Sequence, residues 1–228
     1  MKLLGIDTSS TQCSVALIKE GSILNSSVED SNRRHSTALA TMVKDTLFDS
    51  EIELSGLDGI AVAIGPGSLT GLRVGLAFAK GLCMASSLKI VAVPTLDAMS
   101  RVVKGDSANV KPIIRAKKGF LHTAFYEREN SKFIEIEPYK IIADEDLLTD
   151  NFSRTLLIGD DTVIESVSQY ANSYETIKIS SLSPVAEGVA KIGEEMLIRG
   201  EISEISNLEP DYKMEFKAVE WKTDTISI

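Results

Sequence analysis

The sequence predicts an α/β protein composed of two lobes. Each half of the chain opens with a run of short apolar strands, and in the first half strands then alternate with amphipathic helices. A polar break at Lys104–Gly105–Asp106 separates the two halves. The chain of 228 residues is long enough for two modest lobes, each with its own core. We therefore expect an N-terminal lobe at residues 1–104 and a C-terminal lobe at residues 105–228.

The first half of the sequence predicts helices and strands in the order β-β-β-α-β-α-β-α. Three strands joined by tight turns fill the first thirty residues. A helix over residues 36–49 follows, with apolar side chains at helical spacing on one face. The remaining elements are a buried strand that ends at "GPG", a helix from about Leu69 to Ala85, a strand over "KIVAVPT" and a short helix over "LDAMSRVV".

The second half predicts four strands and one well-marked helix. The segment "VKPIIRAKKGFLHTAFYER" predicts two strands around a turn at Lys117–Lys118–Gly119, and "KFIEIEPYKII" and "TLLIGDD" predict two more. The segment "SPVAEGVAKIGEEMLIRG" begins with Ser-Pro and ends with Gly, which is typical of a helix. We place all of these elements in the second lobe.

The composition narrows the classes of function. With 24 basic and 33 acidic residues, the net charge is -9. Nucleic-acid affinity depends largely on basic side chains that displace counterions, so any role with RNA would run through a partner. The only compact basic group is Lys111, Arg115, Lys117 and Lys118, and a solvated turn is the simpler interpretation of it. No secretory signal and no run of 18 uncharged apolar residues is present, so we expect a cytoplasmic protein without a membrane segment.

The glycine-rich stretch "GPGSLTGLRVG" has two interpretations. Gly65, Gly67 and the first amides of the following helix would suit an anion. However, a P-loop requires Gly-Lys-Ser/Thr where this chain has Gly71-Leu72-Arg73, and the glycine spacing does not match a dinucleotide fingerprint. The alternative is a tight turn in which Ser68 caps the helix.

The helix after this turn has small residues at four-residue spacing. Gly71, Gly75 and Ala79 leave a groove along one side, and apolar residues cover more of the helix than packing on a sheet requires. Small residues at this spacing let a second helix approach closely. We therefore expect a helix–helix interface with another subunit, while packing against the chain's own helix 36–49 would account for part of the pattern.

The sequence lacks the usual catalytic motifs. The only two histidines, His35 and His122, are 87 positions apart, so no His-x-x-x-His metal pair exists, and no Cys/His cluster replaces it. A Gly-x-Ser-x-Gly nucleophile elbow is also absent. These absences favour a protein that is not itself an enzyme.

Four motifs together resemble one family. The segments "LLGIDTSSTQCSVAL", "RHS", "GPGSLTGLRVG" and "VAVPTLDAMS" are similar to the TsaB (YeaZ) family, and "PDYKMEFKAVEWK" is similar to its closing segment. The resemblance implies a two-lobed actin-like ATPase (ASKHA, ribonuclease H-like) fold. It also implies a non-catalytic scaffold in tRNA threonylcarbamoyladenosine modification. Such a subunit pairs with and activates the paralogue TsaD, which holds the metal, and the ATPase TsaE completes the assembly.

The resemblance also implies where the partner binds. The helices at about 36–49 and 69–85 would pack against the same pair of TsaD, or of a second copy as a homodimer when TsaD is absent. The implied interface residues are Leu39, Met42, Val43, Thr46, Gly71, Leu72, Val74, Gly75, Phe78, Ala79 and Leu82. In this superfamily the C-terminal segment of the chain can pack back on the first lobe. The lobe on which the C-terminal segment of this chain packs is therefore left open.

The positions that bind metal and nucleotide in relatives are altered in this sequence. Aligned on the strand "KIVAV", the TsaD metal pair falls on Thr95 and Met99, which are poor ligands for a hard cation. The implied vestigial nucleotide-binding residues are Asp7, Thr8, Ser9, Gly65 and Gly67. Ser9 stands where such loops have glycine, and "IGDD" at 158–161 places carboxylates at the second phosphate loop.

We therefore expect no tightly bound cofactor and at most weak binding of ATP or ADP. In one further departure from the family, Arg115 replaces a common acidic residue. The alternative function is a metal-dependent peptidase or a small-molecule kinase of the actin-like superfamily.

Overall fold

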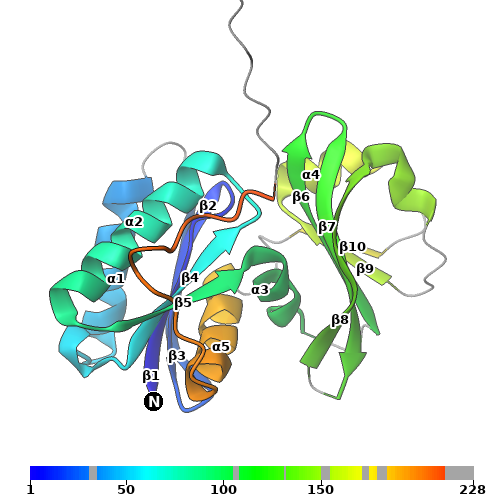
Figure 1. The fold of residues 1–228 in the computed structure, drawn as a ribbon. Coiled ribbons are helices and arrows are strands. Elements are labelled where there is room, and N and C mark those ends of the chain that lie inside the picture. Colours follow the sequence, from blue (N-terminus) through cyan, green and yellow to red (C-terminus); the bar gives the residue numbers. More distant parts are fainter. Residues whose placement is uncertain are drawn as a thin grey trace, which may run out of the picture.

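The chain forms two α/β lobes that lie side by side (Figure 1). This computed structural model describes residues 1–30, 35–104, 108–130, 132–149, 155–170, 175–178 and 184–213. Each lobe is built on a five-stranded sheet, and helix α3 lies between the two sheets.

The first sheet has the strand order β3-β2-β1-β4-β5. Its first three strands form an antiparallel meander, and the last two run parallel to β1. The strands are β1 (Lys2–Asp7), β2 (Gln12–Lys19), β3 (Ser22–Asp30), β4 (Gly59–Gly65) and β5 (Lys89–Pro94).

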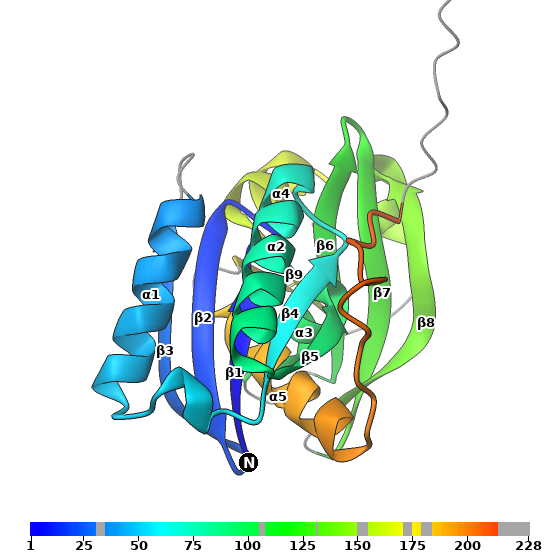
Figure 2. The ribbon, with the colours of Figure 1, turned by 60° about the vertical axis from the view of Figure 1, so that its left-hand side comes forward.

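Helices cover both faces of the first sheet (Figure 2). One face carries α1 (His35–Asp49) and α2 (Leu69–Ser86), with the short 3-10 turn η1 (Leu54–Gly56) after α1. The other face carries α3 (Thr95–Arg101) and α5 (Val185–Ile198). β1 is therefore buried on both faces, and its side chains alternate between two apolar clusters.

The second sheet repeats the topology of the first. Its order β10-β9-β6-β7-β8 again combines an antiparallel meander with two parallel strands. Two sheets of the same order and polarity confirm the predicted two-lobed actin-like fold. The elements are β6 (Asn109–Lys117), β7 (Phe120–Glu129), β8 (Lys132–Ala143), η2 (Asp144–Thr149), β9 (Thr155–Gly159), α4 (Asp161–Val167) and β10 (Glu175–Lys178).

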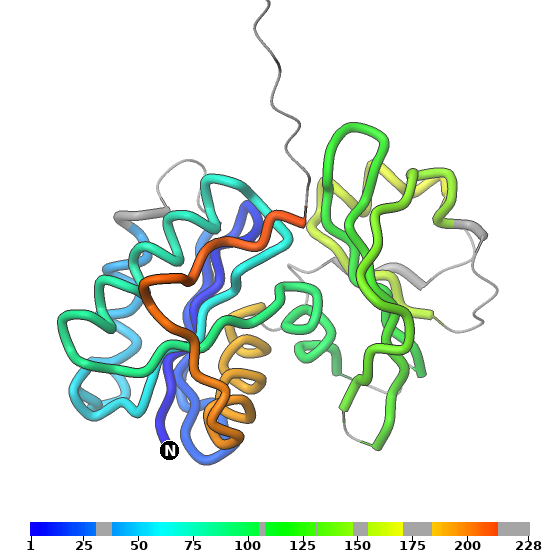
Figure 3. Tube along the Cα trace, viewed as in Figure 1, coloured from blue at the N-terminus to red at the C-terminus, as the bar shows by residue number. Residues whose placement is uncertain are grey.

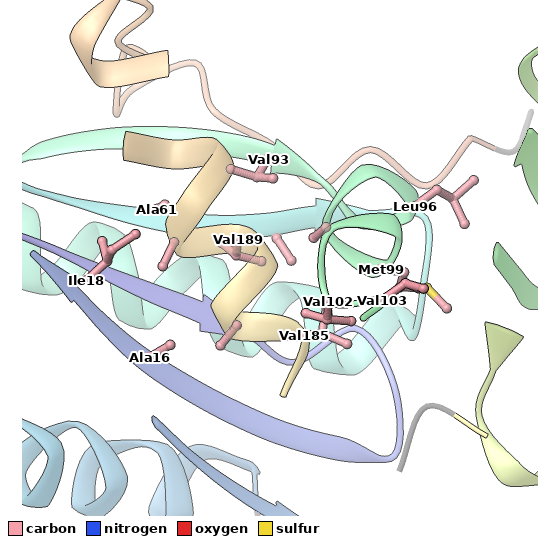
Figure 4. Close-up of a cluster of buried hydrophobic side chains, with 14 of the residues drawn as sticks. Ala16, Ile18, Ala61, Val93, Leu96, Met99, Val102, Val103, Val185 and Val189 are labelled. Atoms are coloured by element: carbon pink, nitrogen blue, oxygen red, sulfur yellow. The ribbon is translucent and has the colours of Figure 1, made fainter. Parts of the chain in front are cut away.

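Helix α5 packs on the first sheet, although it follows the second lobe in the chain. A Cβ at Gly5 would lie 2.5 Å from the carbonyl oxygen of Ala186, so β1 and α5 approach more closely than side chains allow. Ala186 N donates to Ser14 Oγ at 3.1 Å, and Figure 4 shows Val189 of α5 beside the sheet. The division at residue 104 therefore placed α5 in the wrong lobe, because amphipathicity predicts a helix but not the sheet that it covers.

The segment after α5 also runs along the first lobe (Figure 3). Ser203 forms an antiparallel bridge with Ile90 of β5, and Asp211 N donates to the Ile64 carbonyl oxygen at 2.7 Å. The rest of the predicted closing segment, after Lys213, lies outside the described residues.

Candidate partner interface and phosphate loops

The Gly-Pro-Gly turn is packed against the chain's own backbone. Gly65 has a φ of 128°, and a Cβ there would lie 2.1 Å from the Asp211 carbonyl oxygen. A Cβ at Gly67 would lie 2.5 Å from the Ser9 carbonyl oxygen. Ser68 Oγ accepts a hydrogen bond from the Gly71 amide at 3.2 Å. The prediction of a tight turn with Ser68 as the N-cap is confirmed.

The β1–β2 turn fills the space beside the first turn of α2. Thr8 Oγ1 donates to the Gly71 carbonyl oxygen at 2.8 Å, and the Ser68 amide donates to the Ser9 carbonyl oxygen at 2.7 Å. Thr8 and Ser9 are buried. The chain itself therefore explains why glycine stands at the turn, and the binding of ATP or ADP there stays a prediction.

Asp7, at the end of β1, is a buried carboxylate. It is 1% exposed, and its Oδ1 accepts a hydrogen bond from the Ser9 amide at 3.1 Å. Burial raises the pKa of Asp7 from 3.8 to about 6, because the bonds to Ser9 offset only part of the desolvation. Perturbed carboxylates cluster at functional sites. Asp7 is therefore a buried group of the β1–β2 turn, and its role in a nucleotide site stays a prediction.

The second predicted phosphate loop is occupied by its own carboxylate. Asp160 caps α4: its Oδ1 accepts from the Val163 amide at 2.8 Å and from Thr162 Oγ1 at 2.7 Å. The amide that a phosphate would need is therefore already bonded to a negatively charged group.

The positions aligned with the TsaD metal pair lie on α3, directly after β5. The Gly65 amide donates to Thr95 Oγ1 at 3.1 Å, and Met99 is 4% exposed within an apolar cluster. A hydroxyl that is already bonded and a buried thioether do not suit a hard cation. In the described part of the chain, no three His, Cys, Asp or Glu side chains gather as a metal site.

Most of the predicted interface residues are buried inside their own lobe. A Cβ at Gly71 would lie 2.0 Å from the Thr8 carbonyl oxygen, and one at Gly75 would lie 2.2 Å from Thr8 Oγ1. The small residues of this side therefore admit the β1–β2 turn rather than a second molecule. The predicted interface residues that are buried in this way are Leu39, Met42, Val43, Thr46, Gly71, Leu72, Gly75 and Ala79.

The other side of α2 is exposed and also carries small residues. Val74, Phe78 and Leu82 are half-buried, and they are the predicted interface residues nearest to solvent. Beyond them, Ala77, Gly81 and Ala85 recur at four-residue spacing and are exposed, and a Cβ at Gly81 would meet no atom within 4 Å.

Two large apolar side chains project near the ends of these helices. Phe48 of α1 is 79% exposed and Met84 of α2 is 74% exposed. We call the set Phe48, Val74, Ala77, Phe78, Gly81, Leu82 and Met84 the outer face. Phe48, Ala77, Gly81 and Met84 were not among the predicted interface residues, although the sequence contains a second run of small residues four apart.

The predicted basic group does not form one solvent-exposed cluster. Lys111 is 1% exposed within the second sheet, and burial lowers its pKa to about 8. Arg115, which replaces the common acidic residue, forms an ion pair with Asp144 of η2 and donates to Ser166 Oγ of α4. Arg115 therefore ties β6 to two neighbouring elements, and of the four basic residues only Lys117 and Lys118, at the β6–β7 turn, are exposed.

None of the helices among the described residues is long and apolar enough to cross a lipid bilayer.

The chain matches known proteins along most of its length. Residues 23–207 match the model of the family described as tRNA N6-adenosine threonylcarbamoyltransferase, TsaD. The tRNA threonylcarbamoyladenosine biosynthesis protein TsaB of Escherichia coli is 35% identical over 133 residues, which span 58% of this chain and 57% of that protein. The TsaB protein of Bacillus subtilis is 28% identical over 220 residues, which span 93% of each chain.

A solved structure agrees with these matches. The structure of YeaZ from Pseudomonas aeruginosa superposes with a TM-score of 0.79 at 26% identity, covering 92% of this chain and 99% of that one. The chain therefore belongs to the family that the tRNA N6-adenosine threonylcarbamoyltransferase (TsaD) model describes, and within that family to the TsaB (YeaZ) proteins.

Proposed function

We propose that this chain is a non-catalytic subunit in the biosynthesis of tRNA threonylcarbamoyladenosine. It docks through the outer face onto a TsaD-type transferase, which supplies the metal and performs the transfer, and TsaE joins this assembly. A second copy of the chain occupies the same face when the transferase is absent. Contact with tRNA runs through the partner, because the net charge of -9 disfavours direct binding.

The observation that carries this proposal is the exposed apolar side of α2, together with Phe48 at the end of α1. Phe48 and Met84 are both more than two-thirds exposed, and the small residues Ala77 and Gly81 lie on the same exposed side of α2 as Met84. Large apolar side chains that project into solvent are typical of a protein–protein interface. The altered pair at Thr95 and Met99 supports the division of labour, since the relative that owns the metal would be the catalyst.

The proposal is tested by co-expression with the TsaD-type transferase of the same cell and sizing of the purified proteins. The unaltered chain should elute with the transferase. Ala77→Glu places a charge in the middle of the outer face and should elute as a folded, separate protein. Ile198→Glu is the matched control, because Ile198 is 73% exposed but lies at the end of α5, on the opposite face of the first sheet.

Two results would contradict the proposal: no complex with the unaltered chain, or a complex that Ala77→Glu leaves intact. The enzymatic alternative is tested on the same preparation. Stoichiometric metal together with ATP turnover by the isolated chain would favour a peptidase or kinase instead.

A further inference from the structure

The segment after α5 is anchored first to the N-terminal lobe. We call residues 203–213 the strap. The Ser203 amide donates to the Ile90 carbonyl oxygen at 2.9 Å, and the Ala92 amide donates to Ser203 Oγ at 3.2 Å. The Asp211 amide reaches the Ile64 carbonyl oxygen at the end of β4. Up to Asp211, therefore, the strap behaves as an extra piece of the first lobe.

The end of the strap is bonded to the second lobe. The hydroxyl of Tyr139, on β8, donates to the Lys213 carbonyl oxygen at 3.0 Å. His122 Nδ1 lies 2.8 Å from the same hydroxyl and is hydrogen-bonded to it. His122 is 3% exposed, and burial lowers its pKa to about 4, which keeps the ring neutral. Tyr139 is thus held in one orientation toward the strap.

The strap also contacts the helix that carries the outer face. Arg73 Nε of α2 donates to the Tyr212 hydroxyl at 2.6 Å, and the guanidinium carbon lies 5.5 Å from the Tyr212 ring centroid. A groove of about 390 Å³ runs between α2 and the strap, with Ala77 of the outer face in its lining. A molecule that covers Ala77 would therefore border the Arg73–Tyr212 pair. Lys213, which follows Tyr212 in the strap, is the residue that is bonded to Tyr139.

Other contacts between the lobes lie around α3 and α5. The Tyr126 hydroxyl of β7 donates to Asp97 of α3 at 2.5 Å, and Lys132 of β8 pairs with Glu195 of α5 at 2.7 Å. These contacts do not involve the strap. An apolar cluster also joins Met99 of α3 to Ala124 and Leu156 of the second sheet. Release of the strap would therefore leave the lobes joined through α3, while the strap's own tie between them would be lost.

We propose that the strap is a latch that links the outer face to the spacing of the two lobes. Its bond to Tyr139 helps to hold the second lobe against the first. A molecule docked on α2 alters the share of molecules in which this bond is formed, and it acts through Tyr212. The latch itself is independent of the proposed function, whereas its control by docking rests on it.

The latch is tested first on the free chain, by the distance between spin labels at Lys19→Cys and Glu127→Cys. Both sites are exposed and lie in different lobes, and the native Cys13 and Cys83 are buried. The unaltered chain should give one narrow distribution. Tyr139→Phe removes the hydrogen bond to Lys213, together with the bond to His122 inside the second lobe, and the loss of the Lys213 bond should raise the share of longer distances about fivefold.

The control is Tyr170→Phe, which changes a half-buried tyrosine of the second lobe away from the strap. It should reproduce the unaltered distribution, and unchanged near-ultraviolet circular dichroism should show that both variants are folded. A Tyr139→Phe distribution as narrow as that of the unaltered chain would overturn the latch.

The control of the latch by docking is tested by adding the TsaD-type partner to the labelled chain. Binding should shift the distribution, and Tyr212→Ala, which breaks the contact with Arg73, should abolish the shift. A shift that persists in Tyr212→Ala would overturn this control. If the partner does not bind at all, the docking function fails, while the free-chain result on Tyr139 still decides whether the latch exists.

Discussion

Asp7→Asn is expected to stabilise the protein at neutral pH. The carboxylate of Asp7 is buried beneath the β1–β2 turn, where it accepts one backbone hydrogen bond from Ser9. Asparagine has nearly the same shape, and its side-chain oxygen accepts the same bond. The substitution therefore removes the charge and leaves the packing in place.

The size of the effect follows from the pKa of Asp7. One pKa unit corresponds to about 1.4 kcal/mol, so a rise from 3.8 to about 6 corresponds to about 3 kcal/mol. Because the folded-state pKa is raised, the folded chain holds the proton more tightly than the unfolded chain. The contribution of Asp7 to the free energy of unfolding is therefore fully present below about pH 4 and is lost as the pH rises through about 6.

The assay is urea unfolding of both proteins at several pH values between about 4 and 7. The two should be nearly equal at the acidic end, and Asp7→Asn should be more stable by about 3 kcal/mol at the neutral end, with equal m-values. Glu127→Gln, at an exposed position of β7, controls for the loss of a negative charge. Parallel pH profiles for Asp7→Asn and the unaltered chain would refute the reasoning.

Three further predictions concern packing, capping and the thiols. Gly75→Ala forces a methyl group into the β1–β2 turn and should lower the free energy of unfolding, measured in urea, by about 1–3 kcal/mol. Gly81→Ala places its methyl group in open space and should raise the free energy of unfolding by about 1 kcal/mol. Equal values for the two variants would contradict the assigned orientation of α2. Ser68→Ala should lower the urea midpoint, with a loss of about 1 kcal/mol for the missing cap and an unchanged m-value. Burial raises the pKa of Cys13 to about 12 and that of Cys83 to about 11, so neither should react with a thiol reagent at neutral pH until denaturant is added.

Local sequence signals were sufficient for most of the fold. The apolar runs of β1 and β2, the Gly-Pro-Gly break and the Ser68 cap lie within a few residues of the structure they predict, and each was found. The lobe that α5 covers depends instead on Gly5, far away in the chain, where a missing side chain admits the helix. The short helix α4 was missed because its cap, Asp160, was interpreted as part of the second phosphate loop.

The interface residues show a different limit of sequence reasoning. Gly71 and Gly75 form one run of small residues on α2, and Ala77 and Gly81 belong to another with the same spacing. Spacing identifies both sides of the helix as closely approachable but does not distinguish them. The distinction depends on Thr8, which packs against the first run from a turn more than sixty residues away in the sequence.

The two lobes share one topology, so the helices in their equivalent connections can be compared in length. In the part of the second lobe that the structure describes, a five-stranded sheet is covered after β8 and β9 by η2 of six residues and α4 of seven. The equivalent connections of the first lobe carry α1 of 15 residues and α2 of 18, the latter about 27 Å long at 1.5 Å per residue. Phe48 and Met84 lie in the last turns of these longer helices. The extra turns, which are not needed to cover the sheet, are therefore the ones that carry exposed apolar side chains. The cover of a sheet alone gives no reason for that surplus, whereas the docking that we propose would account for it.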